Sequence, residues 1–413
     1  MILEEAFIAM LIGIPLGVAT GLVPGLHVNT LVAIILPFYP MLPFSNYFVV
    51  SLFASVLITH VFVSFIPSIF LGAPDPETSL SVLPGHKMLL EGRGLEAIKL
   101  TVIGSLGALI ASLVLIFLFS GFFVSTYEFS RNYLHYILLA VVAYMVSREL
   151  PGKRLYALMI FMLSGILGFL VLQSSIVPQQ HALFPVLSGL FGVSTLLLSI
   201  NRKGNIPAQK TGRIFIGKSD LAKSILIGSL AGMVVGLLPG IGSTQATIIS
   251  QQMFSLFGAE KFLVAMAGIN AADSVFSLGS LHLVGNPRSG VSVAVEKVMG
   301  KIGFYDFILL LGVVACAAGA AAIITLKLSE RVSKVMGAFD YSAISKSVVA
   351  FIALSVYFFT GLPGVLVLLT SASMGILASS LSVNRSHCMG VLLFPTILFF
   401  AGLTPSVAQF LGI

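Results

Sequence analysis

Charged side chains are scarce in this chain. Aspartate, glutamate, lysine and arginine together make up 9% of its 413 residues, while hydrophobic residues make up 57%. Since a soluble domain carries about 25% charged residues, this protein cannot present an ordinary water-facing surface. Apolar runs of membrane-spanning length recur along the chain, for example at 97–121, 302–326 and 388–410. We therefore expect an all-α polytopic membrane protein, a multi-pass protein of the cell membrane.

Residues for covalent or metal chemistry are scarce too. The two cysteines, Cys316 and Cys388, both stand in apolar sequence, which argues against a disulfide framework or a zinc site. The chain has no His-x-x-x-His, Cys-x-x-Cys or Glu-x-x-His pattern and no nucleophile–base pair at a usable spacing. A membrane enzyme is therefore the least supported class, and we expect no cofactor beyond a coupling ion, Na+ or H+.

The few charged residues indicate how the chain is oriented in the membrane. The net charge of +7 lies in short loops between apolar runs, which fits the positive-inside rule better than nucleic-acid binding. The loop 201–223 carries six basic residues against Asp220, so we expect it in the cytoplasm, whereas the loop 285–301 is expected outside although it carries three basic residues. Glu4 and Glu5 stand where a signal peptide has its positive region, so no cleavable signal peptide is expected.

Two segments far apart in the chain are nearly the same, GVATGLVPGLHVNT and GMVVGLLPGIGSTQ. Four residues recur 215 positions later: Gly17, Gly21, Pro24 and Gly25 return as Gly232, Gly236, Pro239 and Gly240. Proline removes a backbone donor and glycine permits unusual backbone angles, so a helix entering either segment should stop there. Broken helices at matching points of two halves indicate the binding site of a secondary transporter.

The two motifs divide the chain into a first membrane repeat (1–200), a basic connector (201–220) and a second membrane repeat (221–413). Each repeat is predicted to hold one broken helical hairpin, at 6–40 and at 221–257, followed by about five transmembrane helices. These helices are predicted at 47–70, 97–121, 134–148, 155–172 and 183–200, and at 262–283, 303–326, 346–360, 363–381 and 388–411. If each hairpin enters and leaves on one side, five crossings make the repeats inverted relative to each other.

A polar cluster follows each Pro-Gly. The first cluster is His27, Asn29 and Thr30, and the second is Ser243, Thr244 and Gln245. Asn, Ser and Thr cap helix starts, and a helix start offers free N–H groups and the positive end of its dipole to an anion. We predict a substrate site built from these residues and from Pro24, Gly25, Pro239, Gly240 and Gly242. The alternative is that Pro-Gly only kinks a helix and the polar groups satisfy its backbone.

A second correspondence runs at an offset of 213. GAPD at 72–75 matches GNPR at 285–288, and the same offset sets His60 against Asp273, both inside apolar runs. Ionisable groups there are costly and indicate function, so His60, Asp273 and the nearby Asn270 are predicted to couple transport to a proton or sodium ion. The alternative is a buried pair that only packs two helices together.

The loop 74–100 is long for this chain. Its charged residues are interpreted as solvated and structural: Asp75, Glu77, Lys87, Glu91 and Arg93. Arg288 follows a Gly-Asn-Pro turn at the end of a polar-faced segment. It could clamp a carboxylate or phosphate of the substrate, or it could be an ordinary loop arginine.

These motifs resemble those of a known family. GLVPGLHVNTLVAIILPF and GLLPGIGSTQATIIS are similar to the paired Pro-Gly motifs of the large membrane subunit of tripartite tricarboxylate transporters, and GAPDPETSLSVLPGHKMLLEGRGLEAIKL resembles the loop after the first motif. The resemblance runs through both halves. It implies a secondary carrier for di- or tricarboxylates, driven by an ion gradient, with a small membrane subunit and an extracytoplasmic binding protein as partners.

The sequence therefore favours a permease for a small organic anion, coupled to a proton or sodium gradient and surrounded by the lipid bilayer. A polyprenyl-phosphate translocase is the alternative, because the Pro-Gly-x-x-x-x-Thr pattern also resembles that of such lipid carriers. An ion channel or a structural membrane component is a further class. A soluble anion needs a cavity closed from lipid, whereas a polyprenyl chain needs a lateral opening between helices.

Overall fold

The computed structural model describes residues 2–24, 26–41, 43–199, 207–210, 214–237, 242–253, 258–285, 287–336 and 341–411. Every regular element in these ranges is a helix. Eight of the helices are long and apolar enough to cross a membrane, and a ninth span results if the bent pair at the C-terminal end counts as one. The predicted all-α polytopic class is confirmed. Helices suit this chain because a lipid-exposed backbone must satisfy its own polar groups.

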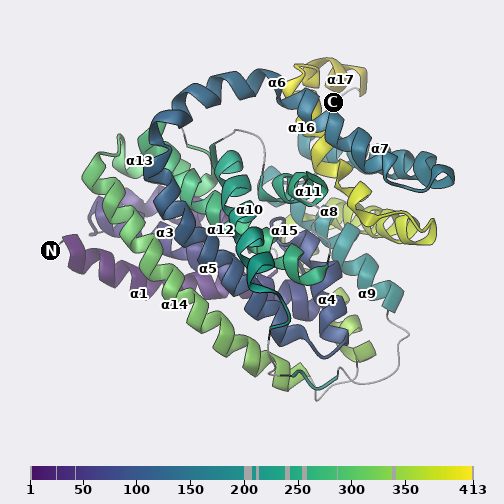
Figure 1. Cartoon of the computed structure of the whole chain (residues 1–413), viewed down its shortest axis with the longest axis horizontal. Coiled ribbons are helices and arrows are strands. Elements are labelled where there is room, and N and C mark those ends of the chain that lie inside the picture. The colour runs from purple at the N-terminus through teal and green to yellow at the C-terminus, as the bar shows by residue number, and fades with distance from the viewer. Residues whose placement is uncertain are drawn as a thin grey trace.

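The helices fall into two series (Figure 1). The first comprises α1 (Ile2–Leu22), α2 (Val28–Ile35), α3 (Asn46–Val63), α4 (Val82–Leu90), α5 (Gly94–Leu118), α6 (Ser120–Ser147), α7 (Arg154–Gln173), α8 (Leu183–Leu187) and α9 (Ser194–Ser199). The second comprises α10 (Lys218–Leu237), α11 (Ser243–Met253), α12 (Ala259–Leu283), α13 (Gly290–Met299), α14 (Phe304–Met336), α15 (Tyr341–Ser380), α16 (Gly390–Phe400) and α17 (Thr404–Leu411). Short 3-10 and π-helical turns join them, among them η2 (Pro67–Leu71), η5 (Gln179–His181), η6 (Ser188–Val193) and η7 (Arg385–Met389).

The break predicted between 346–360 and 363–381 is present, because α15 is kinked where Gly361 adopts a non-helical backbone with a φ of 67°. Two other parts of the predicted plan need correction. The last predicted span, 388–411, is broken, because the chain bends by 114° between α16 and α17. The two long loops also each contain a short helix, α4 in the first half and α13 in the second.

In each Pro-Gly hairpin, the start of the first helix lies close to the start of the helix that follows the hairpin. α1 stops at Leu22, just before the first Pro-Gly, and the described part of α10 ends at Leu237, just before the second. Ser45, the N-cap of α3, donates a hydrogen bond to Glu5 near the start of α1. In the second half, Lys261 of α12 lies 2.8 Å from Asp220 of α10. The chain therefore returns to the end at which each hairpin began.

Glycines let the first helix of each hairpin pack closely on the helix that follows it. A Cβ atom added at Gly17 would lie 2.7 Å from the carbonyl oxygen of Val56, and one added at Gly232 would lie 2.7 Å from that of Ile269. Ile269 follows Val56 by the same offset of 213 that the sequence shows (269 − 56). Small residues are the usual means by which helices approach closely in membranes. The two hairpins are thus packed alike.

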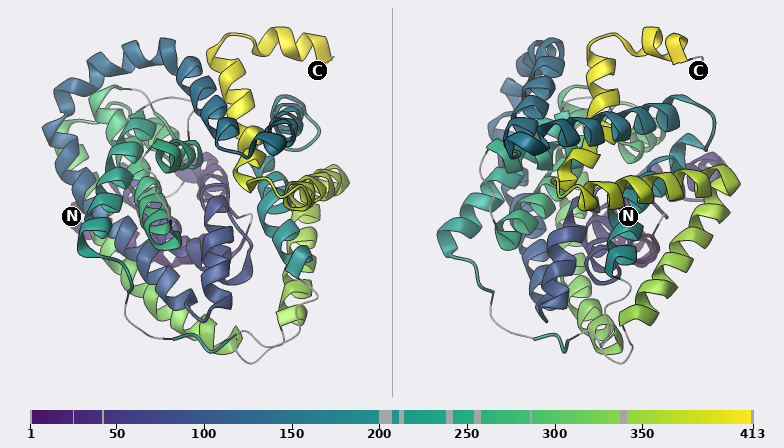
Figure 2. Two further views of the ribbon diagram at one scale, coloured as in Figure 1. Left: turned by 45° about the vertical axis from the view of Figure 1, so that its right-hand side comes forward. Right: turned by 90° about the vertical axis from the view of Figure 1, so that its right-hand side faces the viewer.

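In the core, helices of the first series pack on helices of the second. α5 of the first series packs on α12 of the second, and α14 of the second packs on α3 of the first, as Figure 1 shows along one side of the molecule. At the other side, α7 packs on α16 and α15 packs on η6. In both views of Figure 2 the yellow C-terminal helices and the blue α6–α7 region lie together at one end. Each of these contacts between the series therefore has a counterpart.

Contacts between helix ends show whether neighbouring helices run in the same or in opposite directions. Tyr47 at the start of α3 donates a hydrogen bond of 3.0 Å to Asp306 at the start of α14, so these two helices run the same way. Phe117 at the end of α5 lies 6.0 Å, between ring centroids, from Phe307 at the start of α14, so α5 and α14 run in opposite directions.

An ion-pair cluster joins the starts of α5 and α12. Arg93 donates hydrogen bonds to Glu96 at 2.8 Å and to Glu260 at 2.6 Å, and these bonds raise the pKa of Arg93. The connector is bound at the same place, because the N–H of Phe215 donates to Glu96 at 2.9 Å and Gln209 accepts from the N–H of Gly94 at 2.7 Å. Arg93, interpreted as solvated and structural, is therefore structural, and its side chain is partly buried rather than fully solvated.

Candidate functional site

One polar cavity of about 330 Å³ receives residues from both Pro-Gly motifs. His27 and Asn29 reach it from the first motif, and residues 242–245 reach it from the second. The remaining lining residues are Asp75, Pro76, Glu77, Gln179, His181, Leu183, Phe184, Asp273 and Leu392. No lysine or arginine is among the residues that line it in the described part of the chain. The two motifs, 215 positions apart, therefore share one site.

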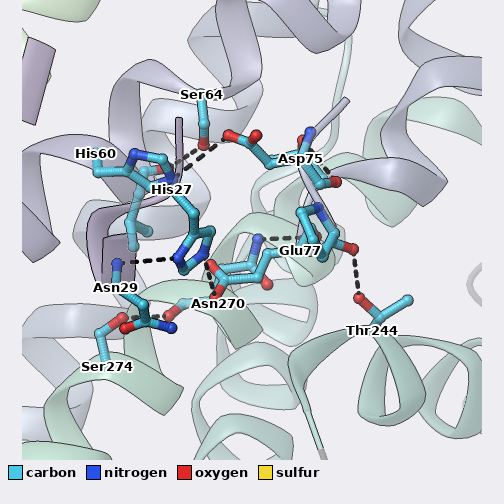
Figure 3. A network of polar contacts seen from close by, with 12 residues as sticks. His27, Asn29, His60, Ser64, Asp75, Glu77, Thr244, Asn270 and Ser274 are labelled. Atoms are coloured by element: carbon cyan, nitrogen blue, oxygen red, sulfur yellow. Dashed lines mark hydrogen bonds and ion pairs between the residues drawn. The ribbon is translucent and has the colours of Figure 1, made fainter. Parts of the chain in front are cut away.

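His27 organises the first motif. Its Nδ1 accepts a hydrogen bond of 3.2 Å from the N–H of Asn29, so His27 is the N-cap of α2. Its Nε2 lies 3.5 Å from Oε1 of Glu77 (Figure 3). The expectation that Asn29 or Thr30 caps this helix was wrong, because the helix begins one residue earlier than Asn29, at Val28.

His60 lies behind His27, with ring centroids 5.1 Å apart, and does not line the cavity. Nδ1 of His60 is 3.1 Å from the hydroxyl of Thr20, and Nε2 is 3.4 Å from Oδ2 of Asp75. The side chains of His60 and Asp75 are only 1% and 3% exposed. Asp75 was interpreted as a solvated loop charge, and the structure buries it as the partner of His60.

The segment from Asp75 to Glu77 is held by side chains of the second series of helices. The hydroxyl of Thr244 donates a hydrogen bond of 2.8 Å to the carbonyl of Pro76, and the amide of Asn270 donates one of 3.1 Å to the carbonyl of Glu77 (Figure 3). The segment thus places the carboxylate of Glu77 against the cavity. Glu77, like Asp75, was taken for a solvated charge, although both lie in the GAPD-containing segment that the repeat comparison had marked.

Asp273 is the acidic residue that α12 contributes to the lining. It is half-buried and makes no hydrogen bond or ion pair with the residues that the structure describes. Its neighbours on α12 are polar, since Ser274 donates a hydrogen bond of 3.0 Å to the carbonyl of Asn270. Asp273 thus lies in an apolar span beside the cavity, and its role in ion coupling stays a prediction.

The second motif presents its helix start to the cavity. α11 begins at Ser243, whose hydroxyl is buried and lacks a hydrogen-bond partner among the described residues. The N–H of Gly242 donates to the side chain of Gln245 at 3.1 Å. Such a helix start offers N–H groups to an anion.

Several residues predicted for the substrate site either lie outside the described residues or do not line the cavity. Gly25, Pro239 and Gly240 lie outside the described residues, as does the side chain of Thr30. Pro24 is buried and does not line the cavity. Arg288 lies outside the lining too, at the start of α13, where its N–H donates to Ser292 at 2.8 Å. Sequence reasoning also missed Gln179 and His181, which carry no motif and reach the cavity only through the fold.

A larger cavity, of about 660 Å³, lies elsewhere. Its lining includes Arg148, Glu149, Gln251 and His387, and it contains none of the predicted site residues. Glu149 lies 3.1 Å from His387 and accepts from the N–H of Asn384 at 2.8 Å. The size of a cavity therefore does not identify the site. We take the smaller cavity as the candidate substrate site because residues of both motifs line it.

A polytopic helical protein with two interrupted hairpins whose breaks share a polar cavity has the architecture of a solute transporter. Residues 7–390 match the family model described as "Tripartite tricarboxylate transporter TctA family", so the chain belongs to that family of transporter components and is a multi-pass integral membrane protein. It is also 31% identical over 400 residues to "Uncharacterized protein MJ1079" of Methanocaldococcus jannaschii, an alignment covering 95% of this chain and 98% of the relative. No solved structure matches it.

Proposed function

We propose that this protein is a secondary active transporter, a permease for a small organic anion of the di- or tricarboxylate class, coupled to a cation gradient. The observation that carries the proposal is the cavity where both Pro-Gly motifs meet and into which Asp273 faces. The starts of α2 and α11 supply N–H groups for the anion, with Asn29, Ser243 and Gln245 as side-chain contacts. Family membership supports the same function.

We further propose that the two repeats, 1–200 and 221–413, are inverted relative to each other. The opposite directions of α5 and α14, the return of each hairpin to its starting end and the reciprocal packing of the helices support this arrangement. An inverted repeat allows one binding site to open alternately to either side. A small membrane subunit and an extracytoplasmic binding protein are the partners that the family suggests.

Uptake into proteoliposomes tests the transport function. The probes are radiolabelled citrate, succinate, malate and inorganic phosphate, offered under an imposed pH gradient and, separately, under a sodium gradient. We expect uptake of at least one carboxylate under one gradient. Asp273→Asn should abolish the gradient-driven part of that uptake without changing the size-exclusion profile, because it replaces the ionisable group that α12 contributes to the cavity by a permanently neutral one. Glu330→Gln, which alters an exposed carboxylate on α14, is the matched control.

The same liposomes distinguish the alternative. If no probe is taken up under either gradient and a fluorescent polyprenyl phosphate is instead moved across the bilayer, the protein is a lipid-phosphate translocase. Normal uptake by Asp273→Asn at every pH and sodium concentration would make Asp273 a structural residue.

A further inference from the structure

The hydrogen bond at the start of α2 fixes the charge of His27. Nδ1 of His27 accepts from the N–H of Asn29, so this nitrogen carries no proton and the ring proton sits on Nε2, facing Glu77. His27 is therefore neutral while it caps α2. A second proton on the ring would point at the N–H of Asn29 and remove the cap.

The buried pair of His60 and Asp75 is neutral as a whole. The hydroxyl of Thr20 donates its single proton to the carbonyl of Gly17 at 3.1 Å, so Nδ1 of His60 must donate to Thr20. Nε2 of His60 then faces Oδ2 of Asp75 at 3.4 Å, an arrangement that requires one proton between the two atoms. Whichever atom holds this proton, the pair has no net charge.

The remaining titratable groups around Glu77 are Asp273 on α12 and His181 in η5. With His27 neutral and the pair behind it neutral, the carboxylates of Glu77 and Asp273 dominate the potential of the cavity. Charges interact strongly in a site shielded from water, so an organic anion is repelled while both carboxylates are ionised. Binding of an anion requires that at least one of them be neutralised.

We propose that Glu77 is the proton-binding site of this transporter and that the coupling ion is a proton. This rests on the proposed transport function. Nε2–H of His27 faces one oxygen of Glu77 and leaves the other for the incoming proton, whereas a metal ion at the same carboxylate would be repelled by that N–H. The nearby carbonyls of Pro76 and Glu77 already accept hydrogen bonds, and within the described ranges no group of three or more His, Cys, Asp or Glu side chains suits a metal ion.

The proposed coupling step is the transfer of one proton to and from Glu77. The carboxylate of Glu77 takes a proton from water on one side of the membrane, forming an O–H bond, and the cavity then accepts the anion. When the site opens to the other side, the anion leaves and the proton returns to water. The side chain of Glu77, 33% exposed, is accessible enough for this exchange, in contrast to Asp75.

Charge displacement without substrate tests the proposal. Full-length protein in proteoliposomes on a solid-supported membrane is given a jump from alkaline to mildly acidic pH without sodium or organic anion, and separately a jump in NaCl at constant pH. We expect a transient charge on the pH jump and none on the NaCl jump. Glu77→Gln should lose most of the transient, Glu77→Asp should restore it, and Glu330→Gln should match the parent. Glu77→Ala replaces Glu77→Gln if that variant does not fold.

Three results would overturn the proposal: no charge on the pH jump in the parent, an unchanged charge in the Glu77 variants, or a NaCl transient that Asp273→Asn removes. Because no substrate is present, these results do not depend on the uptake experiment. Failed uptake with an intact pH-jump charge would reject the transported anion class while leaving the proton site in place.

Discussion

At the residue scale, the site depends on two histidine–carboxylate contacts of different character. His27 and Glu77 border the cavity, with side-chain exposures of 18% and 33%. His60 and Asp75 are almost fully buried. Exposure permits exchange of a proton with water, whereas burial favours a fixed, neutral pair. The first contact is therefore suited to function, and the second to holding the segment from Asp75 to Glu77 against α3.

Substitution of Asp75 tests this division. Asp75→Ala removes one partner of a buried pair, so we expect a loss of about 3 kcal/mol in stability, seen as a clear fall of the melting temperature in detergent. Asp75→Asn should recover most of the loss, because its amide can donate to Nε2 of His60. Equal melting temperatures for Asp75→Ala and the parent would show that the pair does not hold the segment.

At the scale of elements, the contact of α1 with α3 and that of α10 with α12 are counterparts in the two halves of the chain. Each hairpin helix carries glycines four residues apart, Gly13, Gly17 and Gly21 in α1 and Gly228, Gly232 and Gly236 in α10. Backbone carbonyls of the partner helix occupy the space that side chains would need. The broken hairpins are therefore held by backbone packing, which leaves the polar groups after each break available to the cavity.

Alanine substitution measures that packing. A Cβ at Gly17 would lie 2.6 Å from Cβ of Thr59, so Gly17→Ala should destabilise the protein by about 1–3 kcal/mol through overpacking. Gly312→Ala on α14 is the matched control, because nothing lies within 4 Å of a Cβ there. Helix propensity alone should make the control neutral or more stable by up to about 1 kcal/mol. Thermal melts that rank the two variants the other way would contradict the close packing of α1 on α3.

At the scale of the whole molecule, reciprocal contacts tie the halves into one unit. The start of α5 meets the start of α12 through Arg93 and Glu260, and the start of α3 meets the start of α14 through Tyr47 and Asp306. The positions in these two contacts are related by the same offset of 213 (306 − 93 and 260 − 47). The two contacts are therefore counterparts, each joining one helix of each half.

The inverted arrangement predicts opposite exposure of two loops. In a background of Cys316→Ala and Cys388→Ala, a cysteine introduced at Lys87, in the loop of the first half that matches the loop 285–301, should react with a membrane-impermeant maleimide only from the cytoplasmic side. One introduced at Lys301 should react only from outside; both lysines are exposed. The comparison uses intact cells and inside-out vesicles. Labelling of both positions from one side would rule out the inverted repeat.

The sequence by itself determined the membrane class, the place where α1 stops and the correspondence between the halves. These features follow from local causes: few charges, proline and glycine at fixed points, and one spacing of motifs. Whether Asp75 and Glu77 are solvated or held at the site was decided only by the tertiary structure. Thr244 and Asn270, which hold the segment 75–77, are 168 and 193 positions from the residues they contact. A loop carboxylate is solvated unless such distant donors bind its backbone, and no local pattern reveals them.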